Sequence, residues 1–301
     1  MAKKNTKSPA QELKDYKTNT FVDGGMEIRF AVGPEETRQM DTQKLIDNFL
    51  VKNLMVNDEV KLVYTHYDRL IIGGAVPVSK ALSLPNHPEL RADYFLERRE
   101  MGIINVGAKG TVTADGVKYV LENKSCLYLG KGTKKVSFAS SSKKSPAVFY
   151  ILSAPAHAVH PATLFTKEQA SPATMGATAT SNERTIYKYI HLDGIKSCQL
   201  VMGLTILAPG SVWNSVPPHT HTRRMEAYFY FDLPEDQRLF HFMGNPVESR
   251  HIVMANNEAV ISPPWSTHFG CGTTNYGFIW GMAGENLVYS DMDPAPVPTL
   301  K

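Results

Sequence analysis

The sequence predicts an all-β protein that consists of two jelly-roll β-barrel halves with a few short helices. Two observations support this prediction. Short strand-like segments separated by Gly, Asn, Asp and Ser follow one another along most of the chain, and motifs of the first half recur in the second. Short strands at regular spacing, with turn residues between them, are typical of β-sandwiches and β-barrels. The 301 residues are enough for one large β domain or for two smaller ones.

The composition excludes several classes of protein. Hydrophobic residues make up 43% of the chain and charged residues 20%, as in ordinary globular proteins. The net charge of +3 gives no strongly basic face for nucleic acid, although a small anionic substrate would need only local basic residues. No apolar run approaches the roughly 18 residues that cross a bilayer. We therefore expect neither nucleic-acid nor membrane partners.

Cysteine usage and the N-terminus both favour a cytoplasmic protein. Cys126, Cys198 and Cys271 are odd in number and far apart, so a disulfide framework is not expected. The polar N-terminus lacks the apolar core of a signal peptide. Residues 1–25, rich in Lys, Ser, Thr and Asn, predict a flexible tail with little to bury.

One helix is predicted at "DTQKLIDNFLV". Asp41 or Thr42 can cap its N-terminus. Four apolar residues recur at helical spacing along it and would form one buried stripe: Leu45, Ile46, Phe49 and Leu50.

Strands are predicted after this helix, and a polar segment divides the chain. "SPATMGATATSN" (171–182) contains small and polar residues and predicts a linker, with β structure resuming near Ile186. The first half would then span residues 26–170 and the second 183–301. The strand-like segments of the first half are residues 58–68, 101–107, 110–116, 117–123, 126–132 and 135–140.

The two halves resemble each other in sequence. "RREMGIINVG" (98–107) is similar in type to "RRMEAYFYFD" (223–232), and "SCLYLGKGTKKVSF" corresponds to "AVISPPWSTHFGCG". This pattern indicates two copies of one β unit. Lys134 then takes the place of His268, and the first copy has no H-x-H motif. Only the second half is therefore expected to hold a metal ion.

The segment "VPPHTHTRRMEAYFYF" predicts most of a metal site. Residues two apart on a strand share a face, so His219 and His221 point the same way. Glu226 would lie on the opposite face of an unbroken strand, and a bend at residues 222–224 would bring it back. His268 follows the proline-rich turn "SPPW". Three imidazoles and one carboxylate suit zinc, manganese, iron or nickel.

An alternative interpretation makes these histidines surface residues and Glu226 a solvated charge. It leaves unexplained why a carboxylate stands at the head of the apolar run "AYFYF". No G-x-S-x-G, P-loop or strand-linked G-x-G-x-x-G motif offers a different chemistry.

The second half resembles the metal-bearing half of a bicupin. The spacing between its first glycine and the H-x-H motif is longer than usual for that superfamily. The matching residues are Gly210, His219, His221, Glu226, Pro263, His268 and Asn275.

Nearly the whole chain is similar to the 4-deoxy-L-threo-5-hexosulose-uronate ketol-isomerase family. Segments such as "YFLERREMGIINVGAKGTVTADG", "HTRRMEAYFYF" and "FIWGMAGEN" carry the resemblance, from about Phe30 to Asp293. It implies a bacterial, cytoplasmic homohexamer active in pectin and uronate catabolism, with Zn²⁺ as the metal. The family's zinc ligands fall on His219, His221, Glu226 and His268.

The activity implied by this resemblance is an aldose–ketose isomerisation. The substrate would be 5-dehydro-4-deoxy-D-glucuronate and the product 3-deoxy-D-glycero-2,5-hexodiulosonate. Such a reaction requires stabilisation of charge on two oxygens and a group that relays a proton. With four protein ligands, the ion must be five- or six-coordinate to keep positions open.

The sequence leaves the catalytic and substrate-binding residues open. Candidates for the proton relay are His66, Tyr228, Glu285 and Asp291. The substrate carboxylate favours a guanidinium, and candidates for that role are Arg184, Arg223 and Arg224.

Three other functions remain open at this point. A 5-deoxy-glucuronate isomerase is a related bicupin with the same chemistry, and assays with both sugars would separate the two. An iron-dependent cupin oxygenase would consume oxygen with ferrous iron. A non-catalytic bicupin for storage or sugar binding is less consistent with the presence of all four predicted ligands.

Overall fold

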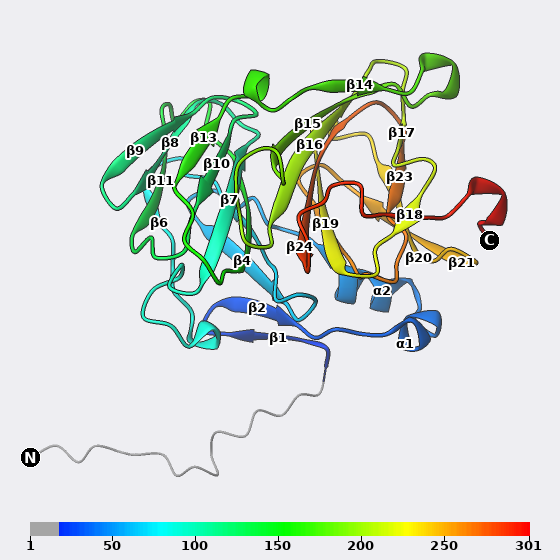
Figure 1. Ribbon diagram of the computed structural model, residues 1–301, viewed down its shortest axis with the longest axis horizontal. Coiled ribbons are helices and arrows are strands. Elements are labelled where there is room, and N and C mark those ends of the chain that lie inside the picture. The colour runs from blue at the N-terminus through cyan, green and yellow to red at the C-terminus, as the bar shows by residue number, and fades with distance from the viewer. Residues whose placement is uncertain (1–17) are drawn as a thin grey trace, which may run out of the picture.

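The computed structural model describes residues 18–301, and these form two β-barrel halves that lie side by side (Figure 1). Each half consists of a larger and a smaller sheet, as in a jelly roll. The strands are antiparallel to their neighbours except for β2 and β4, which pair in parallel. The predicted all-β architecture is confirmed, and the strands predicted in the first half are all present.

The first half has an eight-stranded and a four-stranded sheet. The larger sheet has the order β1 (Thr20–Asp23), β2 (Met26–Arg29), β4 (Val60–Thr65), β5 (Ile71–Ala75), β12 (Phe149–Pro155), β7 (Arg99–Asn105), β10 (Cys126–Leu129), β13 (Thr163–Phe165). The smaller sheet has the order β6 (Leu82–Ser83), β11 (Val136–Ser140), β8 (Gly110–Ala114), β9 (Val117–Leu121).

The second half has a seven-stranded and a four-stranded sheet, with one extra strand pair. The larger sheet has the order β14 (Ala173–Met175), β15 (Arg184–Ile190), β16 (Val201–Leu207), β24 (Gly277–Gly284), β19 (Arg224–Phe231), β22 (Ala259–Ser262), β3 (Leu50–Val51). The smaller sheet has the order β17 (Trp213–Asn214), β23 (Phe269–Gly272), β20 (Leu239–Asn245), β21 (Glu248–Met254), and the extra pair is β18 (His219–Thr220) with β25 (Asp293–Pro294).

The described residues contain two α-helices and four short 3₁₀ turns. The helices are α1 (Pro34–Arg38) and α2 (Thr42–Phe49), and the 3₁₀ turns are η2 (Pro88–Leu90), η3 (Lys167–Gln169), η4 (Thr178–Thr180) and η5 (Val297–Thr299). The predicted helix is confirmed as α2. Its N-cap is Asp41, whose side chain accepts a hydrogen bond from the Lys44 amide at 2.8 Å. None of these helices is long and apolar enough to cross a membrane.

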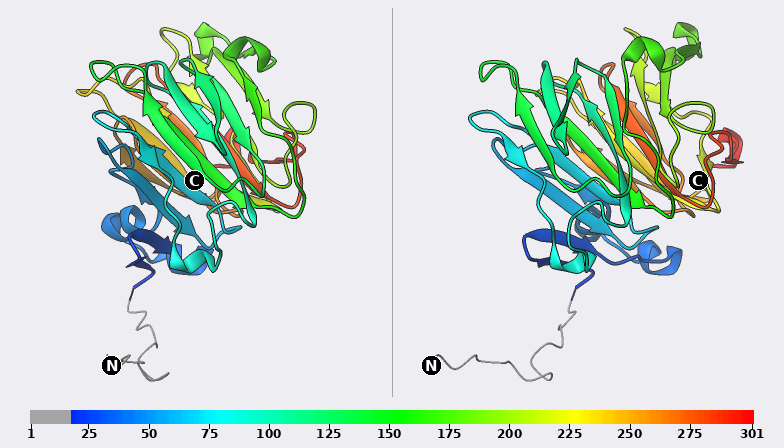
Figure 2. Two further views of the ribbon diagram at one scale, coloured as in Figure 1. Left: turned by 90° about the vertical axis from the view of Figure 1, so that its left-hand side faces the viewer. Right: turned by 60° about the vertical axis from the view of Figure 1, so that its left-hand side comes forward.

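Apolar side chains fill each barrel and the layer between the two larger sheets, which face each other in Figure 2. Strand β19 contributes to two of these cores, because alternate residues point to opposite faces. Tyr228 and Tyr230 point into the second barrel, whereas Phe229 packs against the first half. The ring of Phe229 stacks on Tyr150 with centroids 4.4 Å apart. The two halves therefore share one continuous hydrophobic interface.

Two glycines let the larger sheets approach closely. A Cβ atom on Gly281 would lie 2.0 Å from the Leu152 side chain, and one on Gly102 would lie 2.6 Å from the sulfur of Met202. These glycines lie on β24 and β7, one from each half. The absence of a side chain here allows close packing between the halves.

Three of the predicted boundaries differ from the structure. Residues 34–51 belong in space to the second barrel, because β3 pairs with β22 and the apolar stripe of α2 joins that barrel's core. Residues 20–23 of the predicted tail form β1, which pairs with β2, whereas residues 1–17 lie outside the described residues. The predicted linker contains the short strand β14, because its backbone pairs with β15.

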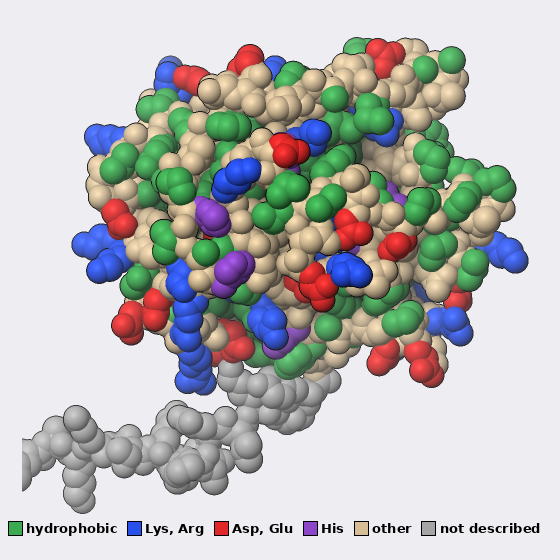
Figure 3. Space-filling model, in the orientation of Figure 1, with side chains coloured by type: hydrophobic (Ala, Val, Ile, Leu, Met, Phe, Trp, Pro, Cys, Tyr) green, Lys and Arg blue, Asp and Glu red, His purple; other side chains and the backbone are tan. Residues whose placement is uncertain are grey.

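Acidic and basic side chains are interspersed on one face of the protein (Figure 3). On the face shown in Figure 3, Lys and Arg lie among Asp and Glu. The polar functional groups described below lie instead inside the second barrel.

Candidate metal centre

The four predicted ligand residues come from three separate parts of the second barrel. His219 lies on β18, and His221 lies in the break between β18 and β19. Glu226 is the third residue of β19, and His268 directly precedes β23. Because the chain breaks after His221 and resumes as β19 at Arg224, Glu226 turns to the same side as the histidines. The predicted bend is therefore present.

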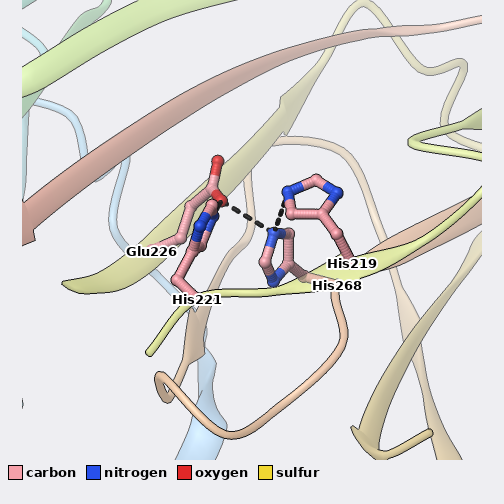
Figure 4. Close-up of side chains that lie close together, drawn as sticks. All are labelled: His219, His221, Glu226 and His268. Atoms are coloured by element: carbon pink, nitrogen blue, oxygen red, sulfur yellow. Dashed lines mark hydrogen bonds and ion pairs between the residues drawn. The ribbon is translucent and has the colours of Figure 1, made fainter. Parts of the chain in front are cut away.

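The side chains of these residues point toward one another (Figure 4). One nitrogen or oxygen from each lies within 4.8 Å of those of the other three. The Nε2 atoms of His219 and His268 are 3.0 Å apart. The Oε2 atom of Glu226 is 2.8 Å from His268 Nε2 and 2.9 Å from His221 Nε2. The structure thus brings together all four residues that the sequence predicted as ligands.

Backbone and hydroxyl groups orient two of the imidazole rings. His221 Nδ1 lies 2.8 Å from the Asp291 carbonyl oxygen, to which it can donate. His268 Nδ1 lies 3.2 Å from Ser262 Oγ and 3.3 Å from the Ser266 carbonyl oxygen. A proton on Nδ1 leaves the lone pair of Nε2 directed at the centre. These partners therefore prepare both rings to bind a cation through Nε2.

The electrostatics of the cluster suit a divalent cation. Burial, followed by the nearby charge of His268, lowers the pKa of His219 to about 2, which keeps its imidazole neutral. Burial alone would raise the pKa of Glu226. In the metal-free cluster, the charge of His268 and the Nε2–H donors of His221 and His268 outweigh this effect and hold that pKa below its usual value. A cation bound to Nε2 of these rings would take the place of those protons. Neutral imidazoles with an ionised carboxylate are the donor set of zinc and related metals.

A cavity of about 300 Å³ opens onto this cluster. Arg184 is the one arginine or lysine among the cavity-lining residues. Its Nη1 donates to the Asn182 carbonyl at 2.8 Å, and burial lowers the pKa of its guanidinium. The remaining lining is mostly apolar, with a few hydroxyl groups. It includes Met175, Ile186, Thr205, Ser215, Tyr228, Phe278, Trp280, Met282, Tyr289 and Met292.

Of the four candidates for the proton relay, Tyr228 alone lines the cavity. His66 is an exposed residue of the first half, and its ring stacks on Phe30. Glu285 is exposed and lies 3.6 Å from Arg223. Asp291 contributes its backbone carbonyl to His221, while its side chain bonds to Asn286.

The three arginine candidates have different positions. Arg184 lines the cavity, whereas Arg223 is exposed and paired with Glu285. Arg224 is fully buried, and its guanidinium donates to the backbone carbonyls of Val288, Tyr289 and Asp291. These bonds make Arg224 a structural partner of that loop rather than a group open to substrate.

Sequence reasoning missed several polar groups around the cluster. Ser215 has a left-handed backbone (φ 54°), and its hydroxyl lies 2.8 Å from the Tyr228 hydroxyl. A non-glycine residue in this region is strained, and such strain is common at functional sites. His241 is fully buried, and its Nδ1 lies 2.8 Å from the Tyr230 hydroxyl. The alternation in "LFHFM" could have indicated this inward position.

Comparison with known proteins places the chain in a family. Residues 49–296 match the KduI/IolB family. The chain belongs to this family. It is 52% identical over 276 residues to a protein of Shouchella clausii named 4-deoxy-L-threo-5-hexosulose-uronate ketol-isomerase, covering 92% of this chain and 100% of the relative.

Other members of the KduI/IolB family show the same degree of similarity. A relative of the same name from Formosa agariphila is 53% identical over 275 residues, which cover 91% of this chain and 98% of that protein. The relative from Caldicellulosiruptor bescii, also of this name, is 52% identical over 276 residues, covering 92% of this chain and all of the relative. The family resemblance noted in the sequence is confirmed.

Solved structures support the fold. An IolB-like protein from Salmonella typhimurium has a TM-score of 0.61 at 14% identity, covering 80% of this chain and 94% of that one. Oxalate decarboxylase from Lactobacillus farciminis has a TM-score of 0.51 at 11% identity, covering 74% of this chain and 79% of that one. These likenesses concern the fold alone, and they confirm the bicupin architecture.

Proposed function

We propose that this protein is a metal-dependent ketol-isomerase that converts 5-dehydro-4-deoxy-D-glucuronate, or 4-deoxy-L-threo-5-hexosulose uronate, to 3-deoxy-D-glycero-2,5-hexodiulosonate. The observation that carries this proposal is the convergence of His219, His221, Glu226 and His268 beside a cavity whose lining includes one arginine, Arg184. The relatives that are about half identical over nearly their whole length bear the name of this activity.

The open-chain substrate has groups that match the polar side chains of the cavity. Its aldehyde and neighbouring hydroxyl lie at one end of a six-carbon chain, and its carboxylate lies at the other. Arg184 offers guanidinium donors for the carboxylate, which can accept two parallel hydrogen bonds. The apolar side chains of Phe278 and Trp280, which also line the cavity, suit the deoxy carbon. The cavity volume is at the lower end of small-molecule sites.

The reaction exchanges hydrogen between two carbons without net oxidation. A divalent ion held by His219, His221, Glu226 and His268 would act as a Lewis acid on the carbonyl and hydroxyl oxygens. One C–H bond breaks at C2 and another forms at C1, while the hydroxyl proton moves from O2 to O1. Burial keeps the pKa of Tyr228 well above its usual value, so its phenol is protonated. We assign Tyr228 Oη to the oxygen-to-oxygen proton transfer, with Ser215 as its hydrogen-bond partner.

The finer properties of the enzyme follow from the family resemblance. We propose Zn²⁺ as the resident metal, one ion per chain, and a cytoplasmic homohexamer as the functional assembly. The His₃Glu donor set supports zinc but also suits manganese, iron and nickel. The proposed biological setting is the breakdown of pectin or a related uronate-containing polysaccharide.

The test is an isomerase assay on purified protein before and after metal chelation. Activity with the 4-deoxy uronate should disappear on chelation and return with one of Zn²⁺, Mn²⁺, Fe²⁺ or Ni²⁺. A parallel assay with 5-deoxy-glucuronate tests the related isomerase, and oxygen uptake with Fe²⁺ tests an oxygenase. Full activity in metal-free protein would contradict the metal-dependent proposal, and turnover of only 5-deoxy-glucuronate would contradict the substrate.

A further inference from the structure

The segment of residues 286–292, here called the C-terminal strap, forms one wall of the cavity. It follows β24 and leads into β25, which pairs with β18, the strand that carries His219 (Figure 1). Tyr289, Ser290 and Met292 of the strap line the cavity. The strap therefore connects β24 to the strand pair that carries His219 and forms part of the cavity lining.

Arg224 fixes the strap from inside the protein. Its Nη1 donates to the Val288 carbonyl at 2.7 Å, and its Nη2 donates to the carbonyls of Tyr289 and Asp291 at 3.1 and 3.0 Å. The Asp291 carbonyl oxygen also lies 2.8 Å from His221 Nδ1. A fully buried guanidinium thus connects the strap to a predicted metal ligand through one shared oxygen.

The first half has an arginine, Arg99, at the position equivalent to that of Arg224, and the two can be compared. Arg99 is the first residue of β7, as Arg224 is of β19, and its guanidinium is also buried. Its Nη2 donates to the carbonyls of Arg69 and Ser153, both at 2.6 Å. Neither of these acceptors lines the cavity. A buried arginine at this position is a feature of both halves, but only Arg224 holds a cavity wall.

The ring of Tyr289 is packed against neighbouring side chains, whereas its hydroxyl has no hydrogen-bond partner among the described residues. Its ring packs on Trp280, with centroids 5.1 Å apart, and the Lys188 ammonium lies 5.4 Å from its centre. Among the described residues, the Tyr289 hydroxyl makes no hydrogen bond, although Glu226, Arg184 and Arg224 lie within electrostatic range. Burial raises its pKa to about 12, so the phenol remains a donor.

We infer that Tyr289 is a substrate-contacting residue, which donates a hydrogen bond to an oxygen of the bound uronate, and that Arg224 is the positioning residue that sets the strap in place. The ring contacts fix the direction of the phenol, and Arg224 fixes the backbone that carries it. This inference rests on the proposed function, since the uronate is the ligand in question.

The first experiment compares Tyr289→Phe with Tyr187→Phe. Tyr187→Phe is the control, because it also removes one phenolic hydroxyl. Tyr187 lies on β15 and does not line the cavity. Loss of a hydrogen bond to a charged or polarised oxygen should lower kcat/KM by roughly ten- to hundredfold in Tyr289→Phe, with unchanged metal content. Calorimetry with the C1-reduced uronate, which cannot isomerise, should show a parallel loss of affinity. Tyr187→Phe should behave as the wild type.

Wild-type values for kcat/KM and for binding of the reduced uronate in Tyr289→Phe would overturn the substrate contact. This failure differs from failure of the proposed function, in which the wild type itself neither isomerises the uronate nor binds its reduced form.

The second experiment compares Arg224→Lys with Arg99→Lys. A lysine donates hydrogen bonds from one nitrogen only, so it cannot replace the planar guanidinium, which reaches the strap carbonyls through two nitrogens. Both variants should lower the melting temperature. Only Arg224→Lys should speed hydrogen exchange of strap amides and lower kcat/KM. Asn286→Ala is the second variant if Arg224→Lys does not fold. It removes the side-chain hydrogen bond from Asn286 to Asp291 and should therefore loosen the strap. Unchanged strap exchange in a folded variant would overturn the positioning role.

Discussion

Met101 and Glu226 occupy equivalent positions in the two halves of the chain. Each is the third residue of its strand, β7 or β19, and each pairs with the last residue of the neighbouring strand, Leu129 or Ser262. Met101 lies in the apolar interior of the first barrel, whereas Glu226 lies among three imidazoles. At this position the first barrel thus has an apolar packing residue where the second has a carboxylate, in addition to its lack of the three histidines.

This relationship predicts one divalent ion per chain. The first barrel offers Met101 where a carboxylate is needed, and Lys134, which precedes β11, is exposed rather than directed inward. Among the described residues, the one cluster of metal-binding groups is that of the second barrel. Elemental analysis of purified protein should give a molar ratio near one. A ratio near two would contradict the single-site interpretation.

His221→Ala should abolish metal binding and isomerisation while the protein remains folded. The barrel has an extensive apolar core around the cluster, including Tyr228, Tyr230 and Phe278. Each large buried side chain contributes about 1.5–3 kcal/mol to stability, so folding should not depend on the ion. Circular dichroism, melting temperature and metal content should be measured on the same samples. An unfolded variant at room temperature would show that the site is structural. A folded, metal-free variant with normal turnover would place the reaction elsewhere.

Glu226→Gln should weaken metal binding and slow the reaction without changing the shape of the site. The amide keeps the volume of the carboxylate but removes the negative charge, which lies 2.8 Å from His268 Nε2 and 2.9 Å from His221 Nε2. Titration against a competing chelator measures the metal affinity, and saturation with metal then isolates the effect on kcat. Unchanged affinity would show that this carboxylate is not a ligand.

Arg184→Met should impair binding of the uronate without affecting the metal. The methionine fills a similar volume but removes the charge-assisted donors for the substrate carboxylate, so KM should rise by roughly ten- to hundredfold. Arg223→Met is the matched control, because Arg223 is exposed and pairs with Glu285 outside the cavity. A wild-type KM in Arg184→Met would place the carboxylate elsewhere.

His241 should make the metal-free protein sensitive to acid. Burial lowers the pKa of its imidazole to about 3, below the value of about 6.5 in an unfolded chain. The unfolded state therefore binds a proton first as the pH falls. The stability that neutral His241 contributes is fully present above pH ~6.5 and declines by up to about 1.4 kcal/mol per pH unit toward pH ~3.

Replacement of this residue tests that pH dependence. His241→Gln cannot take up the proton, so its free energy of unfolding should fall less steeply below pH ~6.5 than that of the wild type. Denaturant unfolding of metal-free samples across this range measures both slopes. Parallel curves for the two proteins would show that His241 does not cause the acid sensitivity.

Much of the site was predictable because its signals are local. The H-x-H spacing places two imidazoles on one strand face, and the break before β19 restores Glu226 to that face. The similarity of "RREMGIINVG" to "RRMEAYFYFD" already aligned Met101 with Glu226. The position of α2 was predictable for the same reason, since Asp41 and the apolar stripe are adjacent in sequence.

The sequence by itself determined the β architecture, its duplication and the residues of the metal cluster, because periodicity and short motifs depend on neighbouring residues. Only the tertiary structure decided that α2 packs on the second barrel, that Arg224 binds three carbonyls, and that Tyr289 lines the cavity. These features depend on contacts between segments tens to hundreds of residues apart. An arginine or tyrosine side chain has the same local pattern whether it faces solvent, a carbonyl or a substrate, and its role is set by what the fold places opposite it.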